Sequence, residues 1–173
     1  ALGGLKLDDW VADLRAVIEA SDIPRPFALL GMSQGAATAT AYAARYPEDV
    51  SHLILAGGFS RGSFCRDDPE QSTLYRAVIE VFRLGFTQSN RAFTDVFTSR
   101  FAPAADSAKR DWFSDLCRRT TTPDVGAELL LARGHMNSSP ELSRITAPTL
   151  ILHARDDQVV PLGESALMSR EIP

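Results

Sequence analysis

The sequence has few cysteines, no long apolar run and no excess of positive charge, and each shortage excludes a class of protein. Only Cys65 and Cys117 are cysteines among 173 residues, so reduced thiols and a cytoplasmic location are predicted rather than a disulfide framework. Neither has a histidine at a metal-site spacing, so no metal and no cofactor are expected. No run of about 18 apolar residues and no signal peptide occur, so no membrane association is predicted. With a net charge of −4 and no basic cluster, nucleic-acid binding is not expected.

The stretch from Phe27 to Gly35, which reads F-A-L-L-G-M-S-Q-G, carries the strongest chemical signal in the chain. Its apolar beginning predicts a strand over 27–32, and the alanine-rich run that follows predicts a helix over 34–45. A G-x-S-x-G pattern between a strand and a helix is typical of a sharp turn that strains the serine and exposes its hydroxyl. An ordinary strand-to-helix turn with an incidental serine is the alternative, and the flanking elements favour the first interpretation.

This pattern assigns roles to four residues. Ser33 is the predicted nucleophile, because its hydroxyl would stand above the end of the sheet at a helix N-terminus. Gly31 and Gly35 are expected to let the strand and the helix approach each other closely. The backbone amide of Gln34 is expected to point to the place where an oxyanion forms on the attacked carbonyl.

Elsewhere the hydrophobic periodicity predicts further elements of an α/β fold. Helical spacing indicates a helix that begins near Leu7 and stops near Ser21, and a last helix from about Gly163. Apolar runs indicate strands over 50–56 and 147–153. Because a strand, a helix and a strand follow one another at this spacing, the first two strands are expected to be parallel.

Residues 59–144 have a different character, with several helical stripes and no convincing strand. We predict a helical cap over a site, inserted into a core formed by residues 1–58 and 145–173. The set Trp112, Phe113 and Leu116 marks one of these helices. The pattern leaves open whether the cap's aromatic residues face a site or pack its own interior.

Two adjacent carboxylates follow the strand predicted over 147–153. Asp156 and Asp157 stand where a catalytic acid would, at the carboxyl end of a strand and therefore at the same edge of the sheet as Ser33. A serine nucleophile needs a base, normally a histidine that a carboxylate orients. A solvated turn or a helix-capping pair is the alternative reading of two consecutive aspartates.

These segments together resemble the α/β-hydrolase fold family. G-M-S-Q-G resembles its nucleophile elbow, and A-P-T-L-I-L-H-A-R-D-D-Q-V-V-P, residues 147–161, resembles its acid-bearing strand and loop. The resemblance covers nearly the whole chain and implies a partial α/β-hydrolase fold with a parallel sheet core, a helical cap insertion and a Ser-His-Asp triad. In the family pattern the acid immediately precedes the position of Gln158, which selects Asp157 over Asp156.

A more particular resemblance lies in residues 46–62, which read Y-P-E-D-V-S-H-L-I-L-A-G-G-F-S-R-G. This segment is similar to a subgroup of bacterial hydrolase domains, as are residues 97–99 and 118–120. Domains of that subgroup are often joined to adenylate/guanylate cyclase domains or to helix-turn-helix regulators. The resemblance therefore implies a possible fusion to a signalling domain in a longer protein.

The base of the triad has no good candidate among the three histidines. His52 is early in its strand and His153 precedes the acid loop. His135 lies in the cap, where a structural role is the more common one, and a role as a substitute base is the alternative. The family's histidine follows a further strand after Pro173, and the family's first strands precede Ala1. We therefore expect an internal fragment, incomplete at both ends, with exposed apolar strand edges.

The sequence thus predicts a serine hydrolase acting on an ester, a thioester or an amide, with a small apolar acyl substrate. The nucleophile and acid would be Ser33 and Asp157, and the histidine would lie outside the segment. Without that histidine the isolated chain is expected to be inactive. The alternative is a catalytically weak, ligand-sensing domain of a bacterial signalling or transcriptional regulator.

Overall fold

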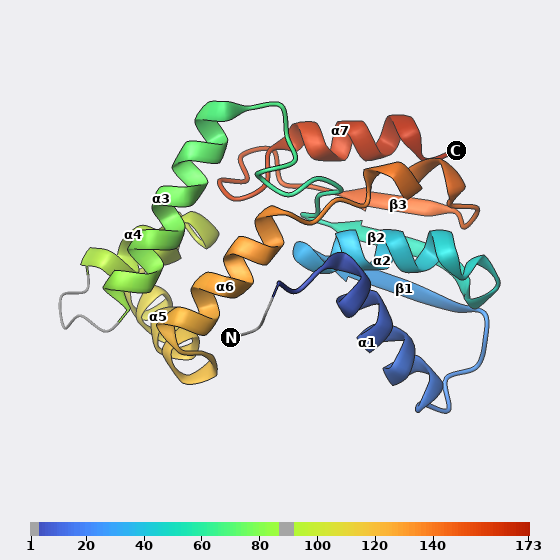
Figure 1. The fold of residues 1–173 in the computed structure, drawn as a ribbon, viewed down its shortest axis with the longest axis horizontal. Coiled ribbons are helices and arrows are strands. Elements are labelled where there is room, and N and C mark those ends of the chain that lie inside the picture. Colours follow the sequence, from blue (N-terminus) through green and yellow to red (C-terminus); the bar gives the residue numbers. More distant parts are fainter. Residues whose placement is uncertain (1–3, 87–91) are drawn as a thin grey trace.

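A computed structural model describes residues 4–86 and 92–173 and shows a three-stranded sheet with helices on one face and at one end (Figure 1). In chain order the elements are α1 (Leu7–Glu19), β1 (Phe27–Met32), α2 (Gln34–Arg45), the 3₁₀ turn η1 (Pro47–Asp49), β2 (Val50–Ala56), α3 (Pro69–Gly85), α4 (Ala92–Phe101), α5 (Ser107–Thr120), α6 (Pro123–Gly134), the 3₁₀ helix η2 (Ser139–Arg144), β3 (Thr149–Leu152) and α7 (Leu162–Glu171).

The sheet is parallel throughout, with the strands in the order β1-β2-β3. Met32 pairs with Ala56, and Ala56 pairs with Leu152, so the carboxyl ends of the three strands coincide. Figure 1 shows α3 to α6 gathered beyond that end, on the left. The chain therefore turns at the same edge after each strand, and the cap helices stand over this edge.

The main core lies between the sheet and the helix α2. Six of the residues buried on α2 are alanines, whose small side chains let the helix lie close to β1 and β2. Leu53 and Leu55 of β2 are fully buried against this helix, and α1 and α7 add Val11, Ile18 and Met168 to the same cluster. Alanine also has the highest helix propensity, so the same residues fix the helix and its distance from the sheet.

The opposite face of the sheet is apolar and uncovered in the described residues. Side chains alternate along a strand, and those that point away from α2 include Leu30 and Met32 of β1, exposed by 56% and 66%. On β3, Leu150 and Leu152 are exposed by 53% and 50%. We expected exposed apolar edges, and the structure shows an exposed apolar face as well.

Most of the predicted element bounds are confirmed, and two expectations need correction. The third strand covers only Thr149–Leu152, not 147–153, because it pairs with β2 only over these four residues. The helix α5 forms where Trp112, Phe113 and Leu116 predicted it, but Trp112 is 66% exposed and the residue buried on α5 is Ser114. The stripe therefore located the helix without identifying its buried face.

A buried tyrosine–aspartate pair connects α2 to η1. Tyr42 is fully buried, and its hydroxyl donates a hydrogen bond to Asp49 Oδ2 over 2.6 Å. Arg15 and Arg25 lie within 3.4 Å of the same carboxylate. Burial, together with this hydrogen bond, raises the pKa of Tyr42 to about 12.

We expect the contribution of Tyr42 to the free energy of unfolding to be constant up to about pH 10 and to be lost between about pH 10 and pH 12. The folded state favours the neutral tyrosine, so this stabilisation is complete below the unfolded pKa of about 10 and is lost as pH rises through the folded value. Tyr42→Phe should remove this alkaline step and cost about 1 kcal/mol at neutral pH. Urea unfolding as a function of pH tests this, and an alkaline step that persists in Tyr42→Phe would contradict it.

Candidate active site

Ser33 sits at a sharp turn between β1 and α2. Its backbone angles are φ 51° and ψ −119°, and it is the only non-glycine residue of the described ranges with a positive φ. Such a conformation costs about 1–3 kcal/mol and persists only where the surroundings impose it. Here the Ser33 amide donates to the Ala56 carbonyl over 2.9 Å, and the Ser33 carbonyl accepts from the Ala36 amide over 3.1 Å. The strand and the helix thus hold the serine from both sides.

The two glycines of the motif differ in what surrounds them. A Cβ on Gly31 would lie 2.7 Å from Ala36 Cα, whereas a Cβ on Gly35 would meet nothing within 4 Å. Gly31 is therefore required for the close approach of the strand and the helix. Among the described residues, no contact requires a glycine at position 35. Gly58, after β2, is the second glycine that the approach requires, because its Cβ would lie 2.1 Å from that of Ala36.

This difference predicts opposite effects of the same substitution. Gly31→Ala should lower the free energy of unfolding by about 3 kcal/mol, because backbone atoms of α2 occupy the space of the new methyl group. Gly35→Ala, the matched control, should raise it by about 0.5–1 kcal/mol, because alanine has the higher helix propensity. Chemical denaturation followed by circular dichroism measures both, and equal effects at the two positions would refute the packing argument.

The predicted acid, Asp157, lies in the loop after β3, and its carboxylate is oriented by the backbone. Oδ1 accepts hydrogen bonds from the amides of Val159 and Val160 over 2.7 and 2.9 Å. Oδ2 lies near Gly57, at the end of β2: a Cβ atom added to this glycine would be 3.7 Å from it. Asp156 is exposed, whereas Asp157 is partly buried. The structure thus distinguishes the two carboxylates in the direction that the family pattern does.

Ser33 and Asp157 line one cavity of about 450 Å³. Its walls are the ends of β1 and β2, the loop that contains Asp156, Asp157 and Gln158, and the end of α4. Residues that are 124 positions apart in the sequence therefore meet at the carboxyl edge of the sheet. This juxtaposition is the central geometric feature of the site.

None of the three histidines lines either cavity at Ser33. His153 has both ring nitrogens engaged: Nε2 donates to the Val160 carbonyl over 2.9 Å, and Nδ1 shares a hydrogen bond with the Ser165 hydroxyl. Since a carbonyl can only accept, Nε2 carries a proton in this arrangement. The Nε2 atom is also 3.8 Å from Asp157 Oδ2, so His153 packs against the loop that contains Asp157 and supports it.

The other two histidines lie elsewhere. His52 pairs with Ala28 in the sheet register, four residues before Met32, which places it about 13 Å along the strand from the elbow. His135 is exposed, and its ring packs on Phe64 with 4.7 Å between the centroids. The structure therefore brings a serine and a carboxylate to one cavity and places no histidine of this chain beside them.

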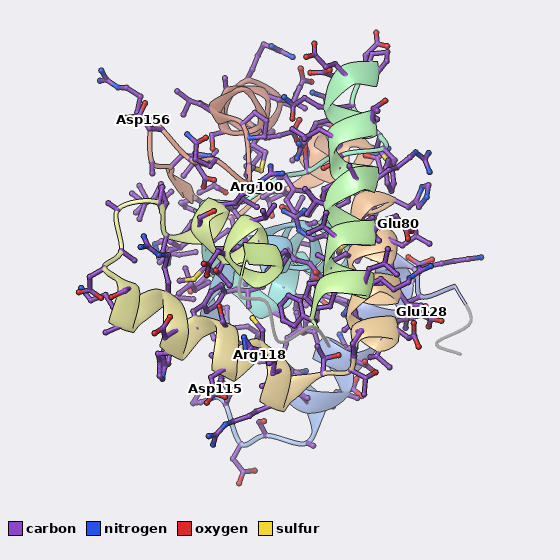
Figure 2. All side chains as sticks on the ribbon, turned by 90° about the vertical axis from the view of Figure 1, so that its left-hand side faces the viewer. Glu80, Arg100, Asp115, Arg118, Glu128 and Asp156 are labelled. Atoms are coloured by element: carbon purple, nitrogen blue, oxygen red, sulfur yellow. The ribbon has the colours of Figure 1, made fainter. Side chains whose placement is uncertain are left out.

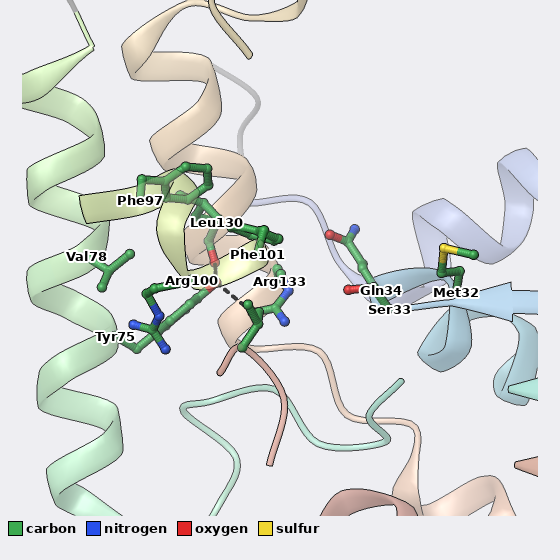
Figure 3. Close-up of a pocket in the computed structure, with 11 residues that line it drawn as sticks. Met32, Ser33, Gln34, Tyr75, Val78, Phe97, Arg100, Phe101, Leu130 and Arg133 are labelled. Atoms are coloured by element: carbon green, nitrogen blue, oxygen red, sulfur yellow. Dashed lines mark hydrogen bonds between the residues drawn. The ribbon is translucent and has the colours of Figure 1, made fainter. Parts of the chain in front are cut away.

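The start of α2 is suited to stabilise negative charge. Gln34 is its first residue, and the first amides of a helix have no intrahelical acceptor. Gln34 lines a second cavity together with Ser33, one of about 270 Å³ that extends between the elbow and the cap helices (Figure 3). The residue whose amide is predicted to donate to the oxyanion thus lines that cavity, at a helix N-terminus where the helix dipole favours an anion.

The second cavity contains residues that sequence reasoning missed. Tyr75 of α3, Arg100 of α4 and Arg133 of α6 line it together with Ser33. They come from three helices and from no recognisable motif, so no local signal in the sequence identifies them. Only the packing of the cap, in which α3 contacts both α4 and α6, brings them together.

Other expected features concern thiols, metals and membranes. Cys65 and Cys117 are both free, and burial raises the pKa of each thiol. Within residues 4–86 and 92–173 no group of three or more potential metal-ligating side chains comes together. Over the same ranges, no helix is long and apolar enough to cross a bilayer.

Comparison with known proteins places this geometry in context. A family model described as "alpha/beta hydrolase fold" matches residues 4–173. The chain is 30% identical over 135 residues to a 2-hydroxy-6-oxononadienedioate/2-hydroxy-6-oxononatrienedioate hydrolase from Pseudomonas sp, which covers 78% of this chain and 47% of that protein. It is 28% identical over 177 residues to a non-heme chloroperoxidase from Burkholderia pyrrocinia, covering 96% of this chain and 62% of the relative.

Solved structures show the same fold. An esterase from Exiguobacterium antarcticum superposes with a TM-score of 0.81 at 25% identity, covering 99% of this chain and 64% of that one. A bromoperoxidase from Bacillus anthracis gives a TM-score of 0.78 at 22% identity and covers 100% and 65%. The chain therefore spans between about half and two thirds of the length of these relatives.

Proposed function

The chain belongs to the α/β-hydrolase fold family, and from this membership we propose that it carries the nucleophile and the acid of a serine hydrolase. The reaction is the hydrolysis of an ester, a thioester or an amide. The observation that carries the proposal is the placement of a strained Ser33 and a backbone-oriented Asp157 in one cavity. A relative that is 30% identical is named as a hydrolase, and a structural neighbour is an esterase.

The proposed chemistry divides into two halves. A base takes the proton of the Ser33 hydroxyl as its oxygen attacks the substrate carbonyl, and the resulting oxyanion accepts a hydrogen bond from the Gln34 amide. The protonated base then gives the proton to the leaving group as the carbon–oxygen, carbon–sulfur or carbon–nitrogen bond breaks. Water, activated by the same base, attacks the acyl-serine and releases the acid and free Ser33.

The base is a histidine outside residues 1–173, which Asp157 orients. The absence of all three histidines of the chain from the cavities at Ser33 supports this part of the proposal. Asp157 Oδ1 is held by two amides, so Oδ2 is the oxygen that would accept from an imidazole Nδ1–H. We further propose that residues 1–173 alone have little hydrolytic activity, because triad members act as a unit.

Turnover of a simple ester tests the proposal against the ligand-sensing alternative. The natural protein that contains this chain should hydrolyse 4-nitrophenyl butyrate, and pretreatment with a fluorophosphonate should abolish that activity. Saturable binding of the ester without hydrolysis would instead favour the sensor. Measuring binding by calorimetry and hydrolysis by absorbance on one preparation separates the two outcomes.

A further inference from the structure

Two arginines line the cavity beside Ser33 on its cap side. Arg133 comes from the last turn of α6 and is only 7% exposed, and Arg100 comes from the last turn of α4. Figure 3 shows both side chains on the wall opposite Ser33 and Gln34. The rest of that wall is mainly apolar and includes Phe97 and Leu130, among other residues.

The guanidinium of Arg133 is held in place but incompletely hydrogen-bonded. Nη1 donates to the Tyr75 hydroxyl over 3.2 Å, and that hydroxyl in turn donates to the Leu130 carbonyl over 2.8 Å. The group also stacks over the ring of Phe59, 4.7 Å from its centroid. Its Nη2 is buried and has no hydrogen-bond partner among the residues that the structure describes. A buried charged donor without an acceptor is costly. Arg66 Nη2 and Arg83 Nε share this state, but neither residue lines a cavity at Ser33, so only the Arg133 guanidinium is placed to meet an acceptor bound there.

Arg100 adds a second positive charge to the same cavity. Its Nη2 donates to the carbonyl of Gln158 over 2.9 Å, and burial, followed by repulsion from Arg133, lowers the pKa of Arg100. Seen from the cap side, Arg100 lies near the middle of the molecule, whereas Glu80, Asp115 and Glu128 lie toward its margins (Figure 2).

No carboxylate of the described residues forms an ion pair with Arg100 or Arg133. Other arginines of this region are paired: Arg61 Nη2 and Arg66 Nε lie 2.9 and 3.6 Å from Glu164 Oε1. Within the described residues, the fold therefore supplies a carboxylate partner to Arg61 and Arg66 but no ion-pair partner to the two arginines of this cavity, although Asp156 and Asp157 line the adjoining cavity together with Arg100. A partly apolar cavity has a lower dielectric constant than water, so two cations in it attract an anion more strongly than two solvated cations do.

We propose that the acyl group of the substrate ends in a carboxylate, which the guanidinium groups of Arg133 and Arg100 bind while the apolar stem lies against Phe97 and Leu130. The proposal rests on the hydrolase function above, because the scissile carbonyl at Ser33 is the second anchor of the same molecule. It refines the earlier expectation of a small apolar acyl group. A monoester of a short dicarboxylic acid has the required chemistry.

Binding of two matched esters tests this without turnover. Monomethyl adipate carries one carboxylate, and dimethyl adipate is its neutral counterpart. The measurement uses calorimetry at neutral pH on the natural protein that contains this chain, carrying Ser33→Ala. We expect the monoester to bind about tenfold more tightly than the diester. A tenfold difference corresponds to about 1.4 kcal/mol, the size of about one charge-assisted hydrogen bond. Equal affinity for the two esters would overturn the proposal.

Two arginine variants test whether the difference in affinity between the esters arises in this cavity. Arg133→Gln should weaken monomethyl adipate about tenfold and leave dimethyl adipate unchanged. Arg66→Gln is the matched control, because Arg66 is also buried near Phe59 but lines neither cavity at Ser33, and it should change neither affinity. If Arg133→Gln does not fold by circular dichroism, Arg100→Gln takes its place. Equal losses for both esters would indicate a purely structural arginine and overturn the proposal.

Fluorophosphonate labelling of the protein with Ser33 intact separates this proposal from the function on which it rests. Discrimination between the two esters without a Ser33 adduct supports an anion site and contradicts the hydrolase. A Ser33 adduct without discrimination supports the hydrolase and contradicts the carboxylate site.

Discussion

Ser33→Ala is expected to lower kcat for 4-nitrophenyl butyrate by about 10⁴ to 10⁶-fold in the natural protein that contains this chain. In the proposed mechanism the hydroxyl forms the acyl intermediate, so its removal should abolish the covalent route and leave only binding and oxyanion stabilisation. Steady-state absorbance measures the rate, and Ser169→Ala, at an exposed serine of α7, is the control that should leave it unchanged.

The Ser33→Ala result depends on a turn that tolerates the change. Alanine at position 33 adopts the same strained backbone as serine, and the hydrogen bonds that impose this backbone come from main-chain atoms of Ala36 and Ala56. We therefore expect an unchanged unfolding midpoint beside the lost activity. A variant that keeps a tenth or more of the wild-type rate would show that another group is the nucleophile.

Asp157→Asn is expected to lower kcat by about 10⁴-fold, whereas Asp156→Asn should leave it within about twofold. An asparagine keeps an oxygen for the Val159 and Val160 amides but offers no carboxylate to a histidine, so it loses the tautomer and charge control that the triad requires. Parallel measurement of kcat in the two variants checks the assignment. Equal effects at both positions, or a larger effect at Asp156, would contradict the choice of Asp157.

Local signals made much of this fold predictable. The alanine-rich run over 34–45 and the apolar run over 50–56 specify α2 and β2 almost alone, because helix propensity and periodicity agree there with tertiary packing. The elbow was predictable for the same reason, since a strand, a strained serine and a helix N-terminus follow one another within a few residues. The acid loop needed the family resemblance to choose between Asp156 and Asp157.

Features that depend on contacts between distant elements could not be predicted. The burial of Arg133 in a cavity results from the way α6 packs on α3, and nothing in its own surroundings in the sequence signals it. In the same way, Gly58 proved to be the glycine that α2 requires beside Gly31, although it lies outside the motif. Trp112 was predicted to mark a helix but lies exposed on it, because periodicity does not say which neighbour a stripe faces.

The central claim is that Ser33 is an activated nucleophile, and intact mass before and after treatment with a fluorophosphonate tests it most directly. The account predicts a single adduct on the natural protein, absent in Ser33→Ala, and little or none on residues 1–173 alone, whose mass is 18.8 kDa. A serine esterase labelled in parallel shows that the reagent is active. A folded protein heavier than 18.8 kDa that gains no adduct under those conditions would contradict the claim.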